Sequence, residues 1–173
     1  LFKELCDKVG QAILASKASN DEEAMNAELN GEKVSEMLVN ATATIGEKIS
    51  LRRVELVTKN DNQTFGVYKH MGGKIATVCV VEGNDAELAK DLSMHITATH
   101  PLYTSKADVP ADYLEKETHV QMELAKNDEK LAGKPEAALA KIIEGKVNKQ
   151  LKEICLLDQP FVKDPGVTVE QHL

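Results

Sequence analysis

Residues 133–164, GKPEAALAKIIEGKVNKQLKEICLLDQPFVKD, predict a helix with one apolar face between two breakers. Gly133 suits the end of a preceding helix, and Pro135 suits the first turn of the next one. The helix is expected to end near Gln159-Pro160, because proline disfavours helical geometry in the residue before it. Its apolar positions keep helical spacing and form one stripe: Leu139, Ile142, Ile143, Val147, Leu151 and Ile154.

The residues before this helix predict a second one that runs antiparallel to it. Pro110 can open that helix, and Gly133-Lys134-Pro135 is a short breaker between the two. We therefore expect a projecting antiparallel helical hairpin over residues 110–157. The expected seam of its first helix keeps a 3-4 spacing through two polar positions, Glu117 and Asn127. The other positions of this seam are Tyr113, Val120, Leu124 and Leu131.

The rest of the chain is predicted to form a core in two parts, with a C-terminal segment. Residues 1–46 show two helical stripes, and Asn20 with Glu23 has the spacing of a capping box. Residues 47–109 turn to an extended period and then return to helix, as expected of a second half of the core. Residues 158–173 are expected to pack back on this core.

Three antiparallel strands are predicted within residues 47–83. The first alternates over 53–56, the second covers 65–68, and the third runs almost wholly apolar over 75–81. So apolar a strand should be covered on both faces. The predicted fold class is therefore α+β: a three-stranded antiparallel sheet packed with helices, plus the projecting hairpin.

The helix expected over residues 84–100 carries one residue that periodicity does not explain. Asn84 and Glu87 have capping-box spacing at its start. At about 100° per residue, Met94 points away from the apolar stripe, and His95 lies on the border of that stripe. Periodicity leaves two alternatives open for Met94, a harmless exposed side chain or part of a docking surface.

Composition excludes several classes of protein. The net charge of −7 argues against nucleic acid as the main partner. No apolar run approaches the roughly 20 residues of a membrane-spanning helix, so no membrane segment is expected. Cys6, Cys79 and Cys155 lie in apolar stretches and are interpreted as buried, reduced thiols of a cytosolic protein. The first residue is Leu1, which suggests a fragment or a processed product.

No catalytic, cofactor or metal site is predicted. The five histidines include no i, i+4 pair, and no cysteine lies near enough in sequence to complete a zinc site. Gly72-Gly73-Lys74 lacks the other residues of a phosphate-binding loop and is interpreted as a hairpin turn. An enzyme is therefore not expected, nor is a small-molecule substrate.

Several strings, in the same order along the chain, resemble the bacterial translation elongation factor Ts family. The C-terminal ones are GKP, IIEGK and LLDQPFVKDP, within residues 133–165. Upstream, Ile45-Gly46-Glu47-Lys48-Ile49 with Leu51-Arg52-Arg53 is similar to the family's IGENI-x-x-RR segment. The remaining two strings resemble its YxH…GKI turn and its MHIA helix: Tyr68-Lys69-His70 with Gly73-Lys74-Ile75, and Leu92-Ser93-Met94-His95-Ile96.

This resemblance implies a function and a partner. The family exchanges guanine nucleotide on the GTPase elongation factor Tu, so a cytoplasmic protein that binds elongation factor Tu and promotes GDP release is expected. The family also allows a homodimer. Its Met-His helix faces the third domain of elongation factor Tu, which assigns Met94 and His95 to partner contact. Because both were placed at or outside the border of the stripe, replacing the pair by alanine is expected to cost no more than about 1 kcal/mol.

Two further expectations follow from the resemblance. The family's exchange motif, Thr-Asp-Phe-Val, and its small N-terminal helical domain are expected to precede Leu1, and no Asp-Phe pair occurs in this chain. These residues therefore correspond to the core, or dimerisation, region. The alternative hypothesis is a helical-hairpin accessory domain of a larger enzyme, which would share the elements without the specific strings.

Overall fold

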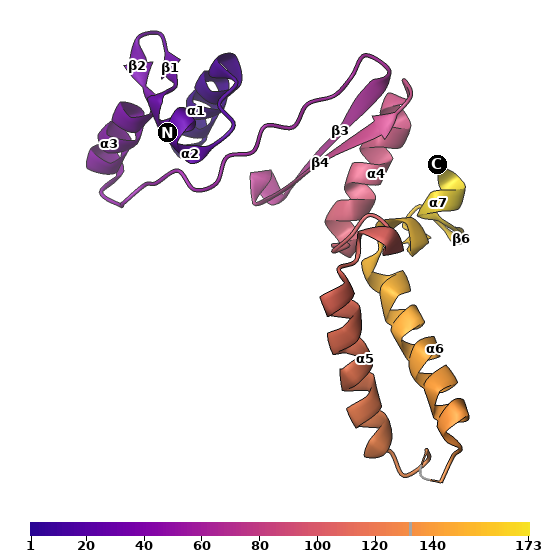
Figure 1. The fold of residues 1–173 in the computed structure, drawn as a ribbon. Coiled ribbons are helices and arrows are strands. Elements are labelled where there is room, and N and C mark those ends of the chain that lie inside the picture. The colour runs from indigo at the N-terminus through magenta and orange to yellow at the C-terminus, as the bar shows by residue number, and fades with distance from the viewer. Residues whose placement is uncertain (132) are drawn as a thin grey trace. The chain divides into compact units, whose positions relative to one another are not determined.

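The computed structural model describes residues 1–131 and 133–173, which form two compact units. The first unit is Leu1–Thr58 and the second is Lys59–Leu173 (Figure 1). Each combines helices with short antiparallel strands, so the predicted α+β class is confirmed.

The first unit is a small helical unit with one short β-hairpin. Its elements are α1 (Phe2–Ser16), α2 (Asp21–Asn26), β1 (Glu28–Leu29), β2 (Glu32–Lys33) and α3 (Val34–Ile45). One cluster of buried side chains holds these elements together: Val9, Ala12, Ala27, Val34, Met37 and Leu38.

Two helix boundaries in this unit confirm the sequence signals. The Asn20 side chain accepts a hydrogen bond of 2.9 Å from the Glu23 amide at the start of α2. Gly46 follows the end of α3 with φ at 81°, a left-handed conformation that glycine adopts without steric strain. Local capping chemistry therefore sets both boundaries.

The strand expected at residues 53–56 does not form, so that prediction is wrong. The Arg53 and Val54 amides donate to the Asp21 carboxylate at 3.2 and 2.8 Å, and Arg53 has φ at 60°. A side chain of α2 thus takes the donors that a strand partner would need. Ile49 and Leu51 pack against the core of the first unit instead.

The second unit begins with an antiparallel hairpin of β3 (Gln63–His70) and β4 (Ile75–Glu82), paired along their full length. The turn between them, η1 (Met71–Gly73), lies where a turn was predicted. Within the described residues β3 and β4 pair only with each other, so the sheet is two-stranded rather than three-stranded.

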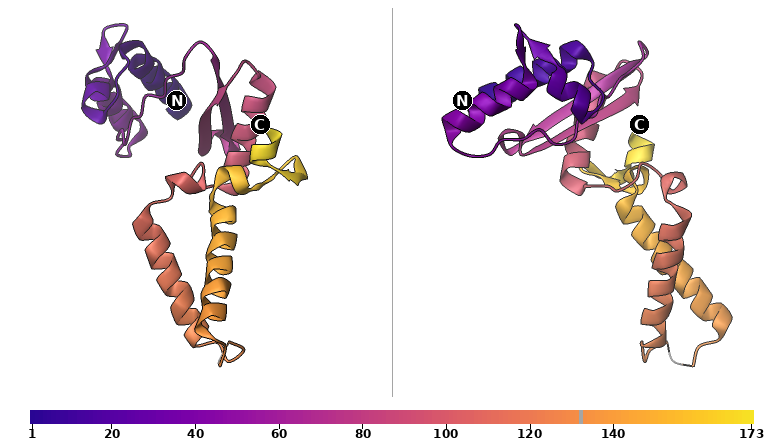
Figure 2. Two further views of the ribbon diagram at one scale, coloured as in Figure 1. Left: turned by 45° about the vertical axis from the view of Figure 1, so that its right-hand side comes forward. Right: turned by 60° about the vertical axis from the view of Figure 1, so that its left-hand side comes forward.

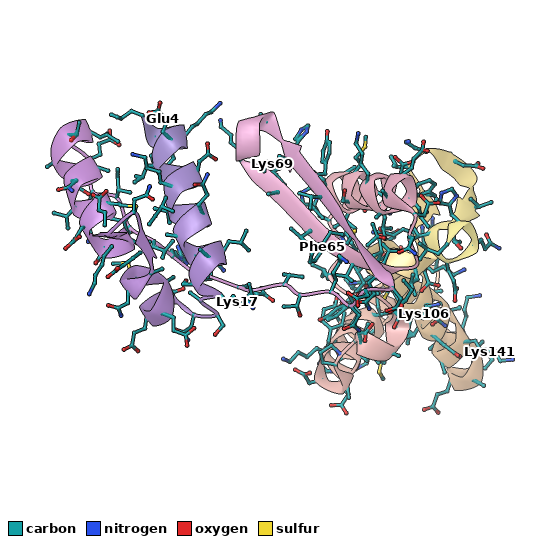
Figure 3. All side chains as sticks on the ribbon, turned by 90° about the horizontal axis from the view of Figure 1, so that it is seen from above. Glu4, Lys17, Phe65, Lys69, Lys106 and Lys141 are labelled. Carbon is teal, nitrogen blue, oxygen red and sulfur yellow. The ribbon has the colours of Figure 1, made fainter. Side chains whose placement is uncertain are left out.

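Within the described part of the second unit, one face of this hairpin is covered and the other is not. Helix α4 (Ala86–Thr99) lies against it so closely that a Cβ atom on Gly66 would fall 2.0 Å from the Ala89 carbonyl oxygen. On the opposite face Phe65, Val67 and Val78 are 37%, 50% and 49% exposed. Phe65 and Lys69 mark this face of β3 in Figure 3. The expectation that β4 is buried on both faces is therefore wrong.

Helices α5 (Ala111–Lys126) and α6 (Glu136–Ile154) form the predicted antiparallel hairpin, which extends away from α4 and β3–β4 (Figures 1 and 2). Helix α6 ends several residues before the predicted stop at Gln159-Pro160. The amides of Leu156 and Leu157 instead donate to the carbonyls of Tyr103 and Thr104, at 2.9 and 3.0 Å. Because these amides bond outside α6, the helix ends at Ile154.

The seam predicted for the first helix of the hairpin is wrong at Val120 and Leu124, whereas Tyr113 and Leu131 pack against the hairpin core as predicted. Val120 and Leu124 are 47% and 56% exposed, whereas Ala125 is buried against α6. The small Ala125 side chain lies about 100° around the helix from Leu124, so contact with α6 at Ala125 turns Leu124 outward. The hairpin core consists of Val109, Ala125, Ile143, Val147, Leu151 and Cys155.

The C-terminal segment packs on α4. It contains η3 (Leu156–Asp158), β5 (Pro160–Phe161), β6 (Asp164–Thr168) and the short helix α7 (Val169–His172). Its buried side chains meet α4 in one cluster: Leu92, Leu156, Phe161 and Val169. Helix α4 is thus covered by the β-hairpin on one side and by this segment on another.

Candidate partner-binding surface

Helix α4 carries Met94 and His95, the residues expected at the partner contact. Asp85 caps the helix, since its carboxylate accepts a hydrogen bond of 2.9 Å from the Leu88 amide. The predicted cap at Asn84 was therefore one residue early. The cap fixes where the helix starts, and so which way Met94 and His95 point.

His95 is completely buried, so its expected place at the border of the apolar stripe is wrong. Both ring nitrogens bond to the C-terminal segment. Nδ1 accepts a hydrogen bond of 3.1 Å from the Val162 amide, and Nε2 lies 2.9 Å from the Gln159 Oε1 atom. Since Nδ1 is an acceptor, Nε2 carries the proton and donates to Gln159. The side chain joins α4 to residues 159–162.

Gln159 is buried and satisfied at both ends of its amide. Its Oε1 atom also lies 2.9 Å from the Thr99 hydroxyl, which donates to it. Its Nε2 atom donates to the Glu153 carbonyl at 2.7 Å. Among the described side chains no buried polar atom is left without a partner. A satisfied network of this kind holds one arrangement of the segment on α4.

Aromatic packing supports the same arrangement. The Phe161 ring is buried, with its centroid 5.7 Å from that of His95. The Phe161 ring also stacks on the His172 ring, with the two centroids 4.1 Å apart and an interplanar angle of 21°. The segment is thereby fixed by apolar contacts as well as hydrogen bonds.

Beside this buried network lies a surface of mixed character, which we call the Met94 surface: Asp91, Met94, Val162 and Lys163. Val162 is 48% exposed although its amide is held by His95. Met94 is half-buried, and Asp91 lies one turn before it on the same side of α4. Lys163 pairs with Asp91 at 2.6 Å. Exposed apolar groups on a fixed backbone, flanked by charge, suit contact with another protein.

The cysteines differ from the expectation that all three are buried. Cys155 is buried, Cys79 is half-buried, and Cys6 is exposed. Desolvation raises the pKa of the Cys79 and Cys155 thiols above the ordinary value, so neither favours the reactive thiolate. Cys6 was misplaced because the first unit buries Val9 and Ala12 on α1 rather than the Cys6 face.

The described residues hold no group of three or more histidine, cysteine or acidic side chains placed to bind a metal ion. Within the same residues no helix is both long and apolar enough to cross a membrane.

Sequence reasoning missed Gln159 and Val162. Gln159 was interpreted only as the residue before a helix-stopping proline, although Asp158 and Gln159 interrupt the apolar residues of LLDQPFV, which was a signal. Val162 carried no signal, because alternation in so short a run does not tell which side faces solvent.

The comparisons with known proteins agree on one family. The sequence profile of the family described as Elongation factor TS matches residues 1–173. Elongation factor Ts of Acholeplasma laidlawii (strain PG-8A) is 50% identical over 173 residues, which is 99% of this chain and 58% of the relative. Elongation factor Ts of Lacticaseibacillus casei (strain BL23) is 44% identical over the same shares of the two chains.

The described residues combine an α+β core with a projecting helical hairpin, and beside α4 they present a surface of apolar and charged side chains. This chain belongs to the elongation factor Ts family. It spans 58% of the length of these two relatives.

Proposed function

We propose that these residues bind elongation factor Tu through the Met94 surface, as part of an exchange factor that promotes GDP release in translation elongation. The observation that carries the proposal is the exposed Val162 side chain on a backbone fixed by buried His95. Family membership supports the identity of the partner. An interaction protein of this kind makes and breaks no covalent bonds, so no enzyme activity is proposed.

Met94 and His95 take different parts in this proposal. Met94 is half-buried beside the Asp91–Lys163 pair and can lie against a partner directly. His95 is buried and acts as a positioning residue, because it reaches the partner only through residues 159–162. Anchors held in place before binding lose less conformational entropy on association.

Binding and exchange can be separated in these residues. The resemblance assigns the nucleotide site of elongation factor Tu to an Asp-Phe pair, and no such pair occurs in this chain. A protein shifts the nucleotide equilibrium only if it binds the two states of its partner with different affinity. We therefore expect these 173 residues to bind elongation factor Tu and to accelerate GDP release little or not at all.

The test is titration calorimetry of elongation factor Tu with Val162→Asp and with the control Val120→Asp. Val120 is 47% exposed, close to the 48% of Val162, but lies on α5. We expect Val162→Asp to weaken binding at least about tenfold and Val120→Asp to change it less than about twofold. Equal affinities of the two variants, with circular dichroism unchanged, would remove the Met94 surface from the contact.

The accessory-domain alternative makes a different prediction. It gives no capture of elongation factor Tu in a pull-down, with or without excess GDP. The proposal gives specific capture of elongation factor Tu. Any weakening of that capture by excess GDP would show in addition that these residues distinguish the nucleotide states of their partner, because binding energies of linked ligands are reciprocal. The family match over all 173 residues favours the exchange-factor hypothesis. The homodimer, the cytoplasmic location and the lack of nucleic-acid and membrane partners stay predictions.

A further inference from the structure

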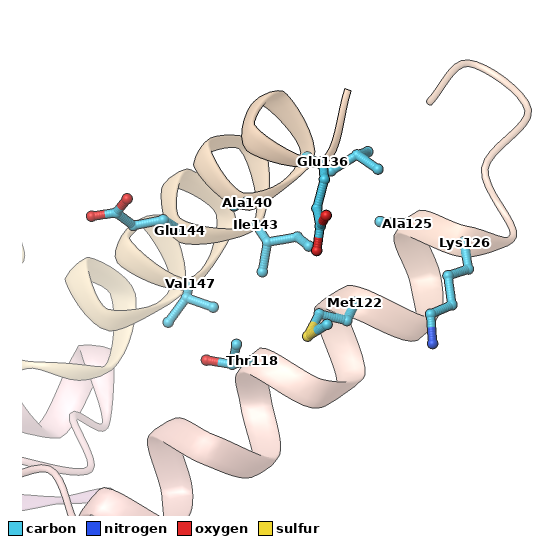
Figure 4. A pocket seen from close by; sticks show the side chains of 10 residues that line it. Thr118, Met122, Ala125, Lys126, Glu136, Ala140, Ile143, Glu144 and Val147 are labelled. Carbon is cyan, nitrogen blue, oxygen red and sulfur yellow. The ribbon is translucent and has the colours of Figure 1, made fainter. Parts of the chain in front are cut away.

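The helical hairpin contains an open groove between α5 and α6, apart from the Met94 surface. Figure 4 shows the side chains that line it. Its volume is about 540 Å³. Its walls are mainly apolar side chains of both helices: Met122, Ala125, Leu139, Ala140, Ile143 and Val147. Met122 is 43% exposed here, so the hairpin does not close over its own apolar lining.

The charged groups at the groove are divided between its two walls. Lys126 lines it from α5, and Glu136 and Glu144 line it from α6. Lys126 is paired with Glu123 at 2.7 Å. Among the ion pairs of the described residues none includes Glu136 or Glu144. The α6 wall therefore presents acidic groups whose charge a ligand can match.

The length of the groove fits one class of ligand. On α6 its lining extends from Glu136 to Val147, or about 17 Å at a rise of 1.5 Å per residue. That is three turns of helix, and helices commonly bind such grooves with apolar residues at i, i+4 and i+7. We propose that the α5–α6 groove binds an amphipathic helix of a partner protein, with basic residues two turns apart beside Glu136 and Glu144.

A second copy of this hairpin fits the groove less well. Face-to-face packing of two such hairpins would set one concave surface against another and leave unfilled space. Packing that sets α6 of one copy on α6 of the other would also bring their acidic groups together, which is unfavourable. A single basic, convex helix meets both the shape and the charge of the groove.

The experiment uses the whole chain and a fluorescein-labelled helical peptide of leucine, alanine and lysine. The peptide carries leucines at i, i+4, i+7 and i+11 and lysines eight residues apart, and a second peptide has glutamate in place of lysine. Fluorescence anisotropy gives the affinities. The groove variant is Ala140→Glu, and its matched control is Ala137→Glu, an equally simple change at another exposed alanine of α6 that does not line the groove.

We expect the lysine peptide to bind, and Ala140→Glu to weaken it at least about tenfold, while Ala137→Glu changes affinity less than about twofold. The double variant Glu136→Lys/Glu144→Lys should bind the glutamate peptide more tightly than the lysine peptide. Equal effects of Ala140→Glu and Ala137→Glu, or equal binding of the two peptides, would overturn the proposal. So would a dimer in sedimentation that Ala140→Glu dissociates, since the groove would then belong to a second copy. None of these results bears on the Met94 surface.

Discussion

His95 shows how one side chain can serve a surface to which it does not belong. Its two nitrogens bond to the Val162 amide and the Gln159 side chain, and the ring itself is buried. An alanine at this position would leave the Val162 amide without its acceptor, and it would remove one of the two hydrogen bonds to the Gln159 Oε1 atom. Groups left buried and unsatisfied in this way cost more than the bond itself was worth.

The first prediction compares neighbouring alanine substitutions on α4. His95→Ala should lower the free energy of unfolding by about 2–4 kcal/mol, through the lost hydrogen bonds and the cavity. Met94→Ala should cost less than about 1 kcal/mol, because its side chain is half-buried and makes no hydrogen bond. Urea denaturation measures both values. The small cost expected for replacing both residues assumed that His95 lies at the border of the stripe, and its burial removes that assumption. A small measured cost for His95→Ala would contradict the hydrogen-bond network.

At the scale of elements, the helical hairpin is attached to the unit through its base. Tyr103 and Tyr113 meet edge to face at 5.9 Å near this base, where Cys155 is also buried. Toward the tip the seam buries only Ala125 and Ile143 from its core cluster. The outer turns therefore add little to the stability of the second unit.

The second prediction removes residues 120–126 and 136–142, two turns from each helix. The cooperative unfolding of the β3–β4 and α4 core should persist, because its buried side chains lie outside the deletion. Scanning calorimetry of the shortened and full chains provides the comparison. Loss of a cooperative transition would show that the hairpin tip is integral to the core.

At the scale of the molecule, the features that could be predicted from sequence are those that residues close together in the chain determine. The Asn20 cap, the glycine after α3 and the breaker between α5 and α6 all act within a few residues of themselves. The errors lie where distant residues compete for the same groups. Asp21 takes the amides of Arg53 and Val54, which lie 32 and 33 residues away, and so prevents a strand.

The same distinction explains the candidate site. Periodicity identified α4 and its buried stripe. The prediction of a single stripe, however, holds only for a helix that is covered on one side. Because β3–β4 and the C-terminal segment both pack on α4, the buried arc widens and takes in His95. The burial of His95 depends on its contact with Gln159, which lies 64 residues away in the sequence, so local periodicity could not predict it.

The third prediction concerns the two units. Each has its own buried cluster, centred on Val34 in the first and on Phe161 and Cys155 in the second. Residues 59–173 expressed alone should therefore fold, as compact units with separate cores do. Amide NMR spectra of this fragment should overlay those of the whole chain for residues of α4 and α6. A collapsed, poorly dispersed spectrum would argue that the first unit is required.

The bond between Tyr103 and Leu156 at the hairpin base has a consequence for folding order. In an unstructured chain, joining His95 to Gln159 closes a loop of 64 residues, at a corresponding cost in chain entropy. Once α5 and α6 have paired and the Leu156 amide has bonded to the Tyr103 carbonyl, most of that loop is already closed. The segments that remain to be closed, from His95 to Tyr103 and from Leu156 to Gln159, are short. Formation of the hairpin thus converts a long-range contact into a nearly local one, so it should precede the docking of residues 159–162 on α4.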